Sequence, residues 1–175
     1  MKFNSPSLFL EINKEKFIFL VVDIFENNNF EVLHKNSTPI QGIYEKKISN
    51  YQIIIDLFKK NIYSIEQKLN FTFKEVILII DNFDCSLINF SGYKKLNGSQ
   101  LLKENITYLL NSLKFKINEN EKNKKILHIF NSKFLLDKKS IDNLPLGLFG
   151  NFYSHELSFF LINNNDYKNL NKILN

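Results

Sequence analysis

The sequence predicts a mixed α/β (α+β) fold, because segments with strand and helix patterns alternate along the chain. Mainly apolar, β-prone runs lie near both ends, at residues 16–25 and 156–162. Between them, two long segments carry apolar residues at steps of three and four, the spacing of an amphipathic helix. With 175 residues, 44% of them hydrophobic, the chain can bury a core as one domain or two small ones.

The first segments predict an antiparallel meander of three strands. Residues 7–12 and 16–25 have the apolar, β-prone composition of the first two strands. The third strand is expected at 30–34, after the turn 27–29, whose asparagines tolerate the left-handed conformation.

An irregular segment with Pro39 and Gly42 is expected next, followed by a long amphipathic helix capped by Ser49 or Asn50. The apolar residues of this helix are Tyr51, Ile54, Ile55, Phe58, Ile62, Ile65 and Leu69. The following run, 75–80, is apolar almost throughout and therefore predicts a strand covered on both faces.

The second half begins with a strand expected at 84–91 and a turn at Ser91-Gly92-Tyr93. A second helix is predicted over 99–117, followed by a charged linker at 118–125. The apolar stripe of this helix comprises Leu102, Ile106, Leu109, Leu110, Leu113 and Ile117.

Two extended pieces, 125–130 and 134–136, lead to a turn at 144–150 that holds one of the three prolines and two of the five glycines. Proline presets φ and glycine supplies positive φ, so this clustering predicts one defined loop. A strand at 156–162 and a helix capped by Asp166 are expected to close the chain.

Composition argues against several classes of function. The net charge of +5 comes from lysines spread along the chain, without arginine, so nucleic-acid binding is not expected. The single cysteine, Cys85, excludes an intramolecular disulfide and is expected to be a buried small residue. The longest uninterrupted apolar run, 17–22, is far shorter than the ~20 residues that span a bilayer, so a cytoplasmic protein is expected.

The order of the last segments resembles the FtsA family of bacterial cell-division actins. The matching residues are Ile-Leu-His at 126–128, Phe-Leu-Leu-Asp at 134–137, Asn-x-Pro-Leu-Gly-x-x-Gly at 143–150 and Glu-Leu at 156–157. The resemblance covers essentially the whole chain, and the Pro-Leu-Gly-x-x-Gly turn is its most specific part.

The resemblance implies the N-terminal half of an FtsA-like protein. On this basis residues 1–82 are the first part of an actin-like, ribonuclease-H-like subdomain, which is only partly present. Residues 83–165 are the inserted strand-helix-strand-strand subdomain, and 166–175 start a helix that returns to the first subdomain.

The resemblance also implies a scaffold role in cell division. It implies protein–protein interaction, self-association and recruitment of later division proteins through the inserted subdomain, rather than catalysis. Full-length relatives bind ATP with Mg²⁺, form filaments and tether the FtsZ ring to the membrane. Their FtsZ contact and membrane-binding terminal helix belong to a portion outside this chain. The expected location is the cytoplasmic face of the membrane at the division site, with the membrane reached only indirectly.

The first phosphate-binding turn of actin-like ATPases, Asp-x-Gly-(Ser/Thr), is altered in this sequence. Glu11 keeps an acid at the first position, but Asn13 replaces the glycine that lets backbone N–H groups approach a phosphate. Lys14 and Lys16 are possible phosphate contacts, but a plain solvated turn is the favoured interpretation. The second phosphate loop of the family lies in a second lobe, so no cofactor is expected in this chain.

No catalytic or metal site is expected elsewhere. His34, His128 and His155 lie in separate strands, without the spacing of a metal site. The carboxylates of Glu104 and Asp137 have no evident partner for acid–base catalysis.

The candidate interaction surface is a sheet edge together with the apolar turn residues Leu146, Leu148, Phe149 and Phe152. Packing of these four side chains against their own sheet is the favoured structural interpretation. Two functional alternatives stay open: a divergent actin-like ATPase and an actin-like protein of type IV pilus assembly.

Overall fold

The computed structural model describes residues 6–25, 29–81 and 83–174. The chain divides into two compact units, which we call unit 1 (residues 1–84 and 165–175) and unit 2 (residues 85–164). The expectation from the sequence placed these breaks after residues 82 and 165. Asn27 and Asn28 of the expected turn lie outside the described residues.

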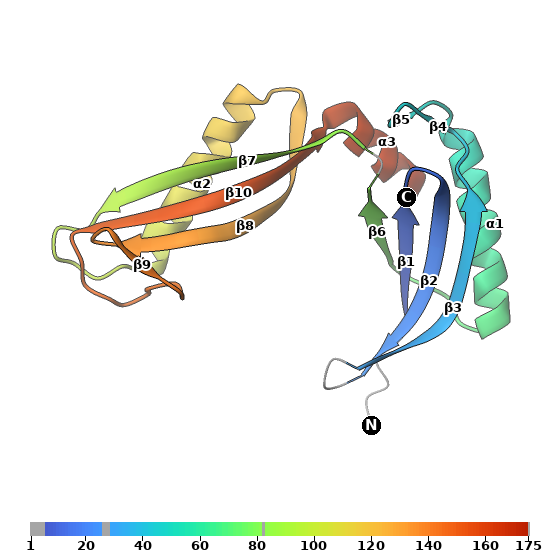
Figure 1. Ribbon diagram of the computed structural model, residues 1–175, viewed down its shortest axis with the longest axis horizontal. Coiled ribbons are helices and arrows are strands. Elements are labelled where there is room, and N and C mark those ends of the chain that lie inside the picture. The colour runs from blue at the N-terminus through green and yellow to red at the C-terminus, as the bar shows by residue number, and fades with distance from the viewer. Residues whose placement is uncertain (1–5, 26–28, 82, 175) are drawn as a thin grey trace. The chain divides into compact units, whose positions relative to one another are not determined.

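Unit 1 contains a four-stranded sheet in the order β3-β2-β1-β6 (Figure 1). The bounds are Ser7–Ile12 for β1, Lys16–Ile24 for β2, Phe30–Pro39 for β3 and Val76–Ile80 for β6. β1 pairs antiparallel with β2 and parallel with β6, and β2 pairs antiparallel with β3, so the predicted meander is confirmed. β3 runs beyond the predicted end at His34, because its polar second half pairs with β2 as a partly solvated edge strand.

The segment expected to be irregular contains a small hairpin. β4 (Ile43–Tyr44) pairs with β5 (Lys47–Ile48) across Glu45 and Lys46. These two residues have φ values of 47° and 62°. Positive φ at both central residues is the geometry of a two-residue hairpin turn, which sequence reasoning missed because neither residue is Gly or Asn.

Helix α1 (Tyr51–Leu69) covers one face of this sheet, as Figure 1 shows. The side chain of Asn50 accepts hydrogen bonds from the N–H groups of Gln52 and Ile53, which confirms one of the two predicted caps. Phe58 packs edge-on against Phe17, with ring centroids 5.1 Å apart, and anchors the helix to the sheet.

Strand β6 is covered on one face only, so that prediction was wrong. Ile77 and Ile79 are 47% and 46% exposed. β6 lies at the edge of the unit 1 sheet, and its side chains alternate between the two faces. An apolar run does not reveal whether both faces of its sheet are covered.

Unit 2 contains a second four-stranded sheet, in the order β7-β10-β8-β9. The bounds are Cys85–Lys95 for β7, Lys124–Leu136 for β8, Lys139–Ile141 for β9 and Phe152–Asn163 for β10. The turn predicted around Gly92 is absent, because β7 continues through it in unbroken register with β10. A Cβ atom at Gly92 would lie 3.0 Å from Cδ2 of Leu109, so this glycine lets helix α2 (Lys103–Asn120) approach the strand closely.

β8 is one strand where two extended pieces were predicted. Its pairing with β10 shifts register twice, opposite Glu156/Leu157 and Phe160/Leu161, and these irregularities interrupt the alternation that the sequence pattern relies on. β9, which was not predicted, follows a hairpin turn at Asp137 and Lys138, with φ values of 48° and 69°.

Helix α2 begins at Lys103, four residues after the predicted start. The backbone N–H of Leu102 donates to Oδ1 of Asn105 over 2.9 Å and fixes this start. Leu109, Leu113 and Ile117 are buried as predicted, whereas Leu102 is half exposed and lies outside the apolar stripe. The predicted linker is shorter, because α2 and β8 both extend into it.

Helix α3 (Asn164–Leu174) closes the described chain, and Asp166 lies inside it rather than at its cap. Burial raises the pKa of the Asp166 carboxyl, and Asp84 adds to that rise while Lys47 opposes it. Within the described residues, no helix is both long enough and apolar enough to span a membrane.

Candidate interaction surface

The glycine turn of unit 2 has a single, hydrogen-bonded conformation. The N–H of Leu148 donates to the carbonyl of Pro145 over 3.3 Å. Gly147 lies between them with φ of 80°. A type II turn requires positive φ at its third residue, and glycine adopts it without strain. The loop predicted from the Pro and Gly clustering is therefore present.

The turn is held by the segment that precedes α2. Leu101 N–H donates to the carbonyl of Leu148, and Gly147 N–H donates to the carbonyl of Leu101, each over 2.9 Å. Gln100 and Phe149 form an antiparallel bridge. Leu101 is fully buried beneath the turn. The helix was predicted to start at Ser99, but Gln100 and Leu101 pair with the turn instead.

The carboxylate of Asp137 forms hydrogen bonds with the other end of the same loop. Its Oδ1 accepts hydrogen bonds from the N–H groups of Asn151 and Phe152, each over 2.8 Å, and its own N–H donates to the carbonyl of Phe152. The carboxylate that sequence reasoning left without a partner therefore has a structural role.

The four predicted surface residues are all exposed. Leu146, Leu148, Phe149 and Phe152 expose 48%, 49%, 68% and 48% of their surface. The favoured interpretation had these side chains packed against their own sheet, whereas the structure leaves about half or more of each one exposed. Leu102 and Leu144 are also exposed, at 50% and 38%. We call these six residues the apolar tip.

Sequence reasoning missed two members of the apolar tip. Leu144 is the first residue of the predicted turn 144–150 and was not included in the candidate surface. Leu102 was assigned to the apolar stripe of α2, and only the bridge between Gln100 and Phe149 brings it to the tip. Lysines border the same segments: Lys95, Lys103, Lys138 and Lys139 are exposed.

Strand β7 forms one long edge of the unit 2 sheet. Leu87 and Tyr93 lie on the same side of this strand, because their positions differ by an even number. They are 59% and 70% exposed. The edge thus presents a second exposed set of apolar side chains.

The altered phosphate turn in unit 1 is closed by its own side chain. Oδ1 of Asn13 accepts hydrogen bonds from the N–H groups of Glu15 and Lys16, over 3.0 and 2.9 Å. Nδ2 of Asn13 donates to the carboxylate of Glu11 over 3.4 Å. Two backbone N–H groups of this turn are therefore already used within the turn, as in other Asx turns.

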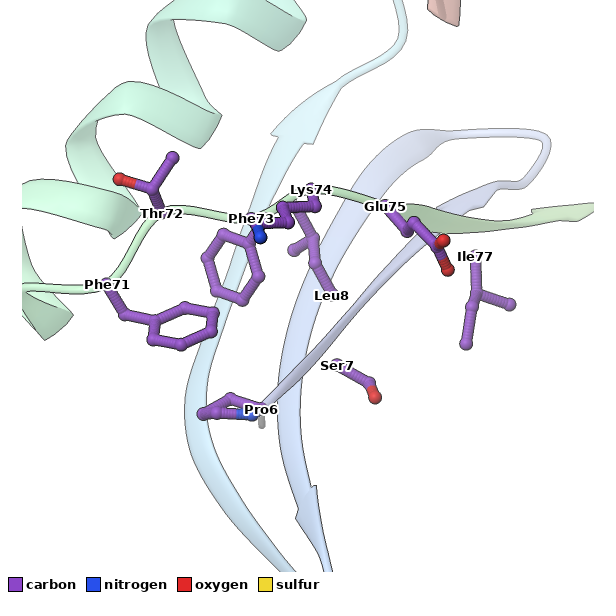
Figure 2. A pocket seen from close by; sticks show the side chains of 9 residues that line it. All are labelled: Pro6, Ser7, Leu8, Phe71, Thr72, Phe73, Lys74, Glu75 and Ile77. Atoms are coloured by element: carbon purple, nitrogen blue, oxygen red, sulfur yellow. The ribbon is translucent and has the colours of Figure 1, made fainter. Parts of the chain in front are cut away.

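A pocket of about 500 Å³ lies at the opposite end of the same sheet (Figure 2). It is lined by Pro6, Ser7, Leu8, Phe71, Thr72, Phe73, Lys74, Glu75 and Ile77. The rings of Phe71 and Phe73 meet edge-on, 5.2 Å apart. The pocket adjoins the amino ends of β1 and β6, whereas ligands of α/β sheets bind at the carboxyl ends of the strands.

The buried polar groups of unit 2 lie in its core. Nε2 of His155 is 3.0 Å from Oδ1 of Asn131, and its ring packs 4.8 Å from Phe134. Burial lowers the pKa of His155 and raises the pKa of neighbouring Tyr153 to about 12. Both side chains are packed under α2 in the core rather than gathered at a cleft.

The remaining candidates do not come together. His34 and His128 lie on strands of different units, and the described residues contain no group of three or more potential metal ligands. Glu104 lies in the first turn of α2. Cys85 is only partly buried, at the start of β7.

The mixed α/β fold that the sequence predicted is also found in a solved protein structure. A solved structure described as a PilM–PilN type IV pilus biogenesis complex matches 96% of this chain and 43% of its own chain. The TM-score is 0.58 and the sequence identity 10%. At this identity the match establishes the mixed α/β fold alone.

In sequence, the chain is similar to the cell division protein FtsA. FtsA of Buchnera aphidicola subsp. Schizaphis graminum (strain Sg) is 23% identical over 163 residues, which is 93% of this chain. FtsA of Buchnera aphidicola subsp. Acyrthosiphon pisum (strain APS) is 23% identical over 141 residues, or 81% of this chain. No protein-family model matches. The alignments cover 38% and 33% of these relatives, so the chain spans little more than a third of their length.

Proposed function

We propose that the chain is the binding portion of an FtsA-type cell-division scaffold. It recruits division proteins or a second copy of itself through unit 2, on the cytoplasmic face of the membrane at the division site. Similarity to two FtsA proteins over most of the chain supports the division role. The observation that carries the binding role is the exposed apolar tip of unit 2.

Unit 2 offers two interaction surfaces in this proposal. One is the apolar tip, which includes Leu146, Leu148, Phe149 and Phe152. The other is the edge of β7, where Leu87 and Tyr93 are exposed. Unpaired strand edges and exposed apolar patches are the two kinds of surface that proteins commonly use for recognition.

A nucleotide-independent role is part of this proposal. In the turn around Asn13, the side-chain oxygen of Asn13 accepts hydrogen bonds from two backbone N–H groups. The same side chain fills space that a glycine would leave open to a phosphate. We assign ATP, Mg²⁺ and the FtsZ contact to full-length relatives rather than to this chain. A divergent ATPase is the alternative, and submicromolar binding of ATP with Mg²⁺ to the purified chain would support it over a non-functional Asn13 turn.

A second candidate function is pilus assembly, which the fold match to the PilM–PilN complex favours. The sequence relatives favour division instead. Location in growing cells separates the two, since a fluorescent fusion of the chain gathers at the septum only if it takes part in division.

The binding experiment uses the purified 175-residue chain, immobilised and exposed without lipid to purified later division proteins and to a second copy of the chain. We expect capture of at least one of them, and loss of that capture in Tyr93→Ser or Phe149→Ser. Phe115→Ser is the matched control, because Phe115 is 62% exposed on α2. Capture that none of the three variants alters places the contact outside both surfaces.

A further inference from the structure

We propose that the apolar tip of unit 2 inserts into the surface of an anionic lipid bilayer. This contact goes beyond the proposed protein-binding function and does not depend on it. It places a membrane contact on this chain itself.

The side chains of the tip suit the apolar zone of a lipid surface. Its six members are leucines and phenylalanines, and Phe149 is the most exposed at 68%. Five of them lie on or beside the paired segments around Leu101 and Leu148, and Phe152 is the first residue of β10. The three pockets described for the chain are lined by unit 1 residues. Exposed apolar side chains at a loop end match the shallow apolar zone beneath lipid headgroups.

The segments that carry the tip have an excess of positive charge. The segments 94–104 and 136–152, which form this end of unit 2, contain five lysines and three carboxylates. One of these carboxylates, Asp137, accepts two backbone N–H groups of the loop. Glu104 and Asp142 are the other two. The excess of lysine is complementary to the phosphate groups of anionic lipids, which attract basic side chains near the surface.

The backbone of the tip is held in one conformation. Backbone hydrogen bonds tie Leu101 to Leu148 and to Gly147, and the Gln100–Phe149 bridge continues this pairing. Pro145 and Gly150 are buried beneath the exposed side chains. A loop that is already ordered loses little conformational entropy on binding. Less of the free energy gained by burying its apolar side chains is therefore offset.

The experiment places a single tryptophan at the tip. The natural chain contains none, so Phe149→Trp reports only the surroundings of that side chain. The full chain is mixed with vesicles of phosphatidylcholine and phosphatidylglycerol in equal parts. We expect a blue shift of the emission, quenching by brominated lipid acyl chains, and neither effect with pure phosphatidylcholine. Phe115→Trp is the matched control, since Phe115 is 62% exposed on α2, and its emission should stay unchanged.

A second pair of variants tests the charge argument. Lys138→Glu with Lys139→Glu should weaken vesicle binding about tenfold or more, because two attractive charges become repulsive. Lys59→Glu with Lys60→Glu makes the same change in net charge on the exposed surface of α1 and should have little effect. Thermal unfolding of all variants confirms that each one is folded.

Three results would overturn the proposal. One is an unshifted Phe149→Trp emission with anionic vesicles. Another is an equal shift in Phe115→Trp, which indicates nonspecific adsorption. The third is a shift of the tip tryptophan that appears only when a purified division protein is added without lipid, since the tip then binds protein and not lipid.

Discussion

The backbone N–H of Phe152 donates a hydrogen bond of 2.8 Å to Oδ1 of Asp137. This bond joins the turn between β8 and β9 to the first residue of β10. The same oxygen accepts the N–H of Asn151. The exposed leucines and phenylalanines of the tip therefore project from a loop that is fixed on both sides.

Replacing Asp137 with alanine should destabilise unit 2 by about 1 kcal/mol, because two backbone N–H groups lose their acceptor at a solvent-exposed site. Positive φ at this position adds a smaller cost, since alanine adopts it less readily than aspartate. Asp137→Asn keeps one acceptor oxygen and should lose less. Urea unfolding followed by circular dichroism gives the three free energies, and equal stability of all three proteins would show that the bonds contribute nothing.

Gly92→Val should destabilise the chain by about 1–3 kcal/mol through overpacking. Even a Cβ atom would lie 3.0 Å from Cδ2 of Leu109 and 3.2 Å from Cδ1 of Leu113. Ser91→Val introduces the same side chain on the exposed face of β7 and is the control. Thermal unfolding of both variants decides the matter, and a Gly92→Val protein as stable as Ser91→Val would show that α2 does not need this close approach.

Stability should fall as the pH drops below about 6.5, the usual pKa of histidine. Burial lowers the pKa of His155 in the folded chain. Between the two pKa values the unfolded chain binds a proton that the folded chain does not, so acid favours unfolding. The loss levels off once the pH passes below the folded-state pKa.

His34 also contributes to the fall in stability at acid pH, because burial and Lys68 lower its pKa. A His155 variant separates the two contributions. His155→Gln removes the titrating group, so its free energy of unfolding should change less between pH 7.5 and 5. Denaturant unfolding at several pH values measures both proteins. Parallel curves for wild type and His155→Gln would contradict a buried neutral His155.

Adding ATP with Mg²⁺ should leave the melting temperature of the chain unchanged. A ligand that binds the folded state raises the melting temperature in proportion to the logarithm of its concentration over Kd. Asn13 already occupies the N–H groups of Glu15 and Lys16. A scanning fluorimetry series in ATP measures this directly, and a rise that grows with ATP concentration would support the ATPase alternative.

Local sequence patterns predicted most elements of this fold, and failed where distant contacts decide the outcome. The first helix and its cap at Asn50 follow from spacing and a side-chain oxygen, which are local properties. The sequence analysis assigned Gly92 to a turn, which is the usual place of a glycine. Its role in a strand follows from the close packing of Leu109, and that contact is not visible in the local sequence. The exposed faces of Ile77 and Ile79 depend on what covers the sheet, which the apolar run cannot show.

The candidate surface was predictable in part. The Pro145 and Gly147 turn identified the loop and its four apolar members. Their exposure was not predictable, because an apolar residue in a loop can pack inward or outward. The roles of Leu102 and Asp137 depend on pairing between segments far apart in the sequence. Local sequence patterns do not predict such pairing.

The central claim is that unit 2 carries the binding surfaces of this chain. Hydrogen exchange measured by mass spectrometry, on the chain alone and with a captured division protein, tests it most directly. We predict slower exchange within residues 85–164, at β7 or at the loop 144–152, with residues 13–16 unchanged. Slowed exchange confined to unit 1 would contradict the account.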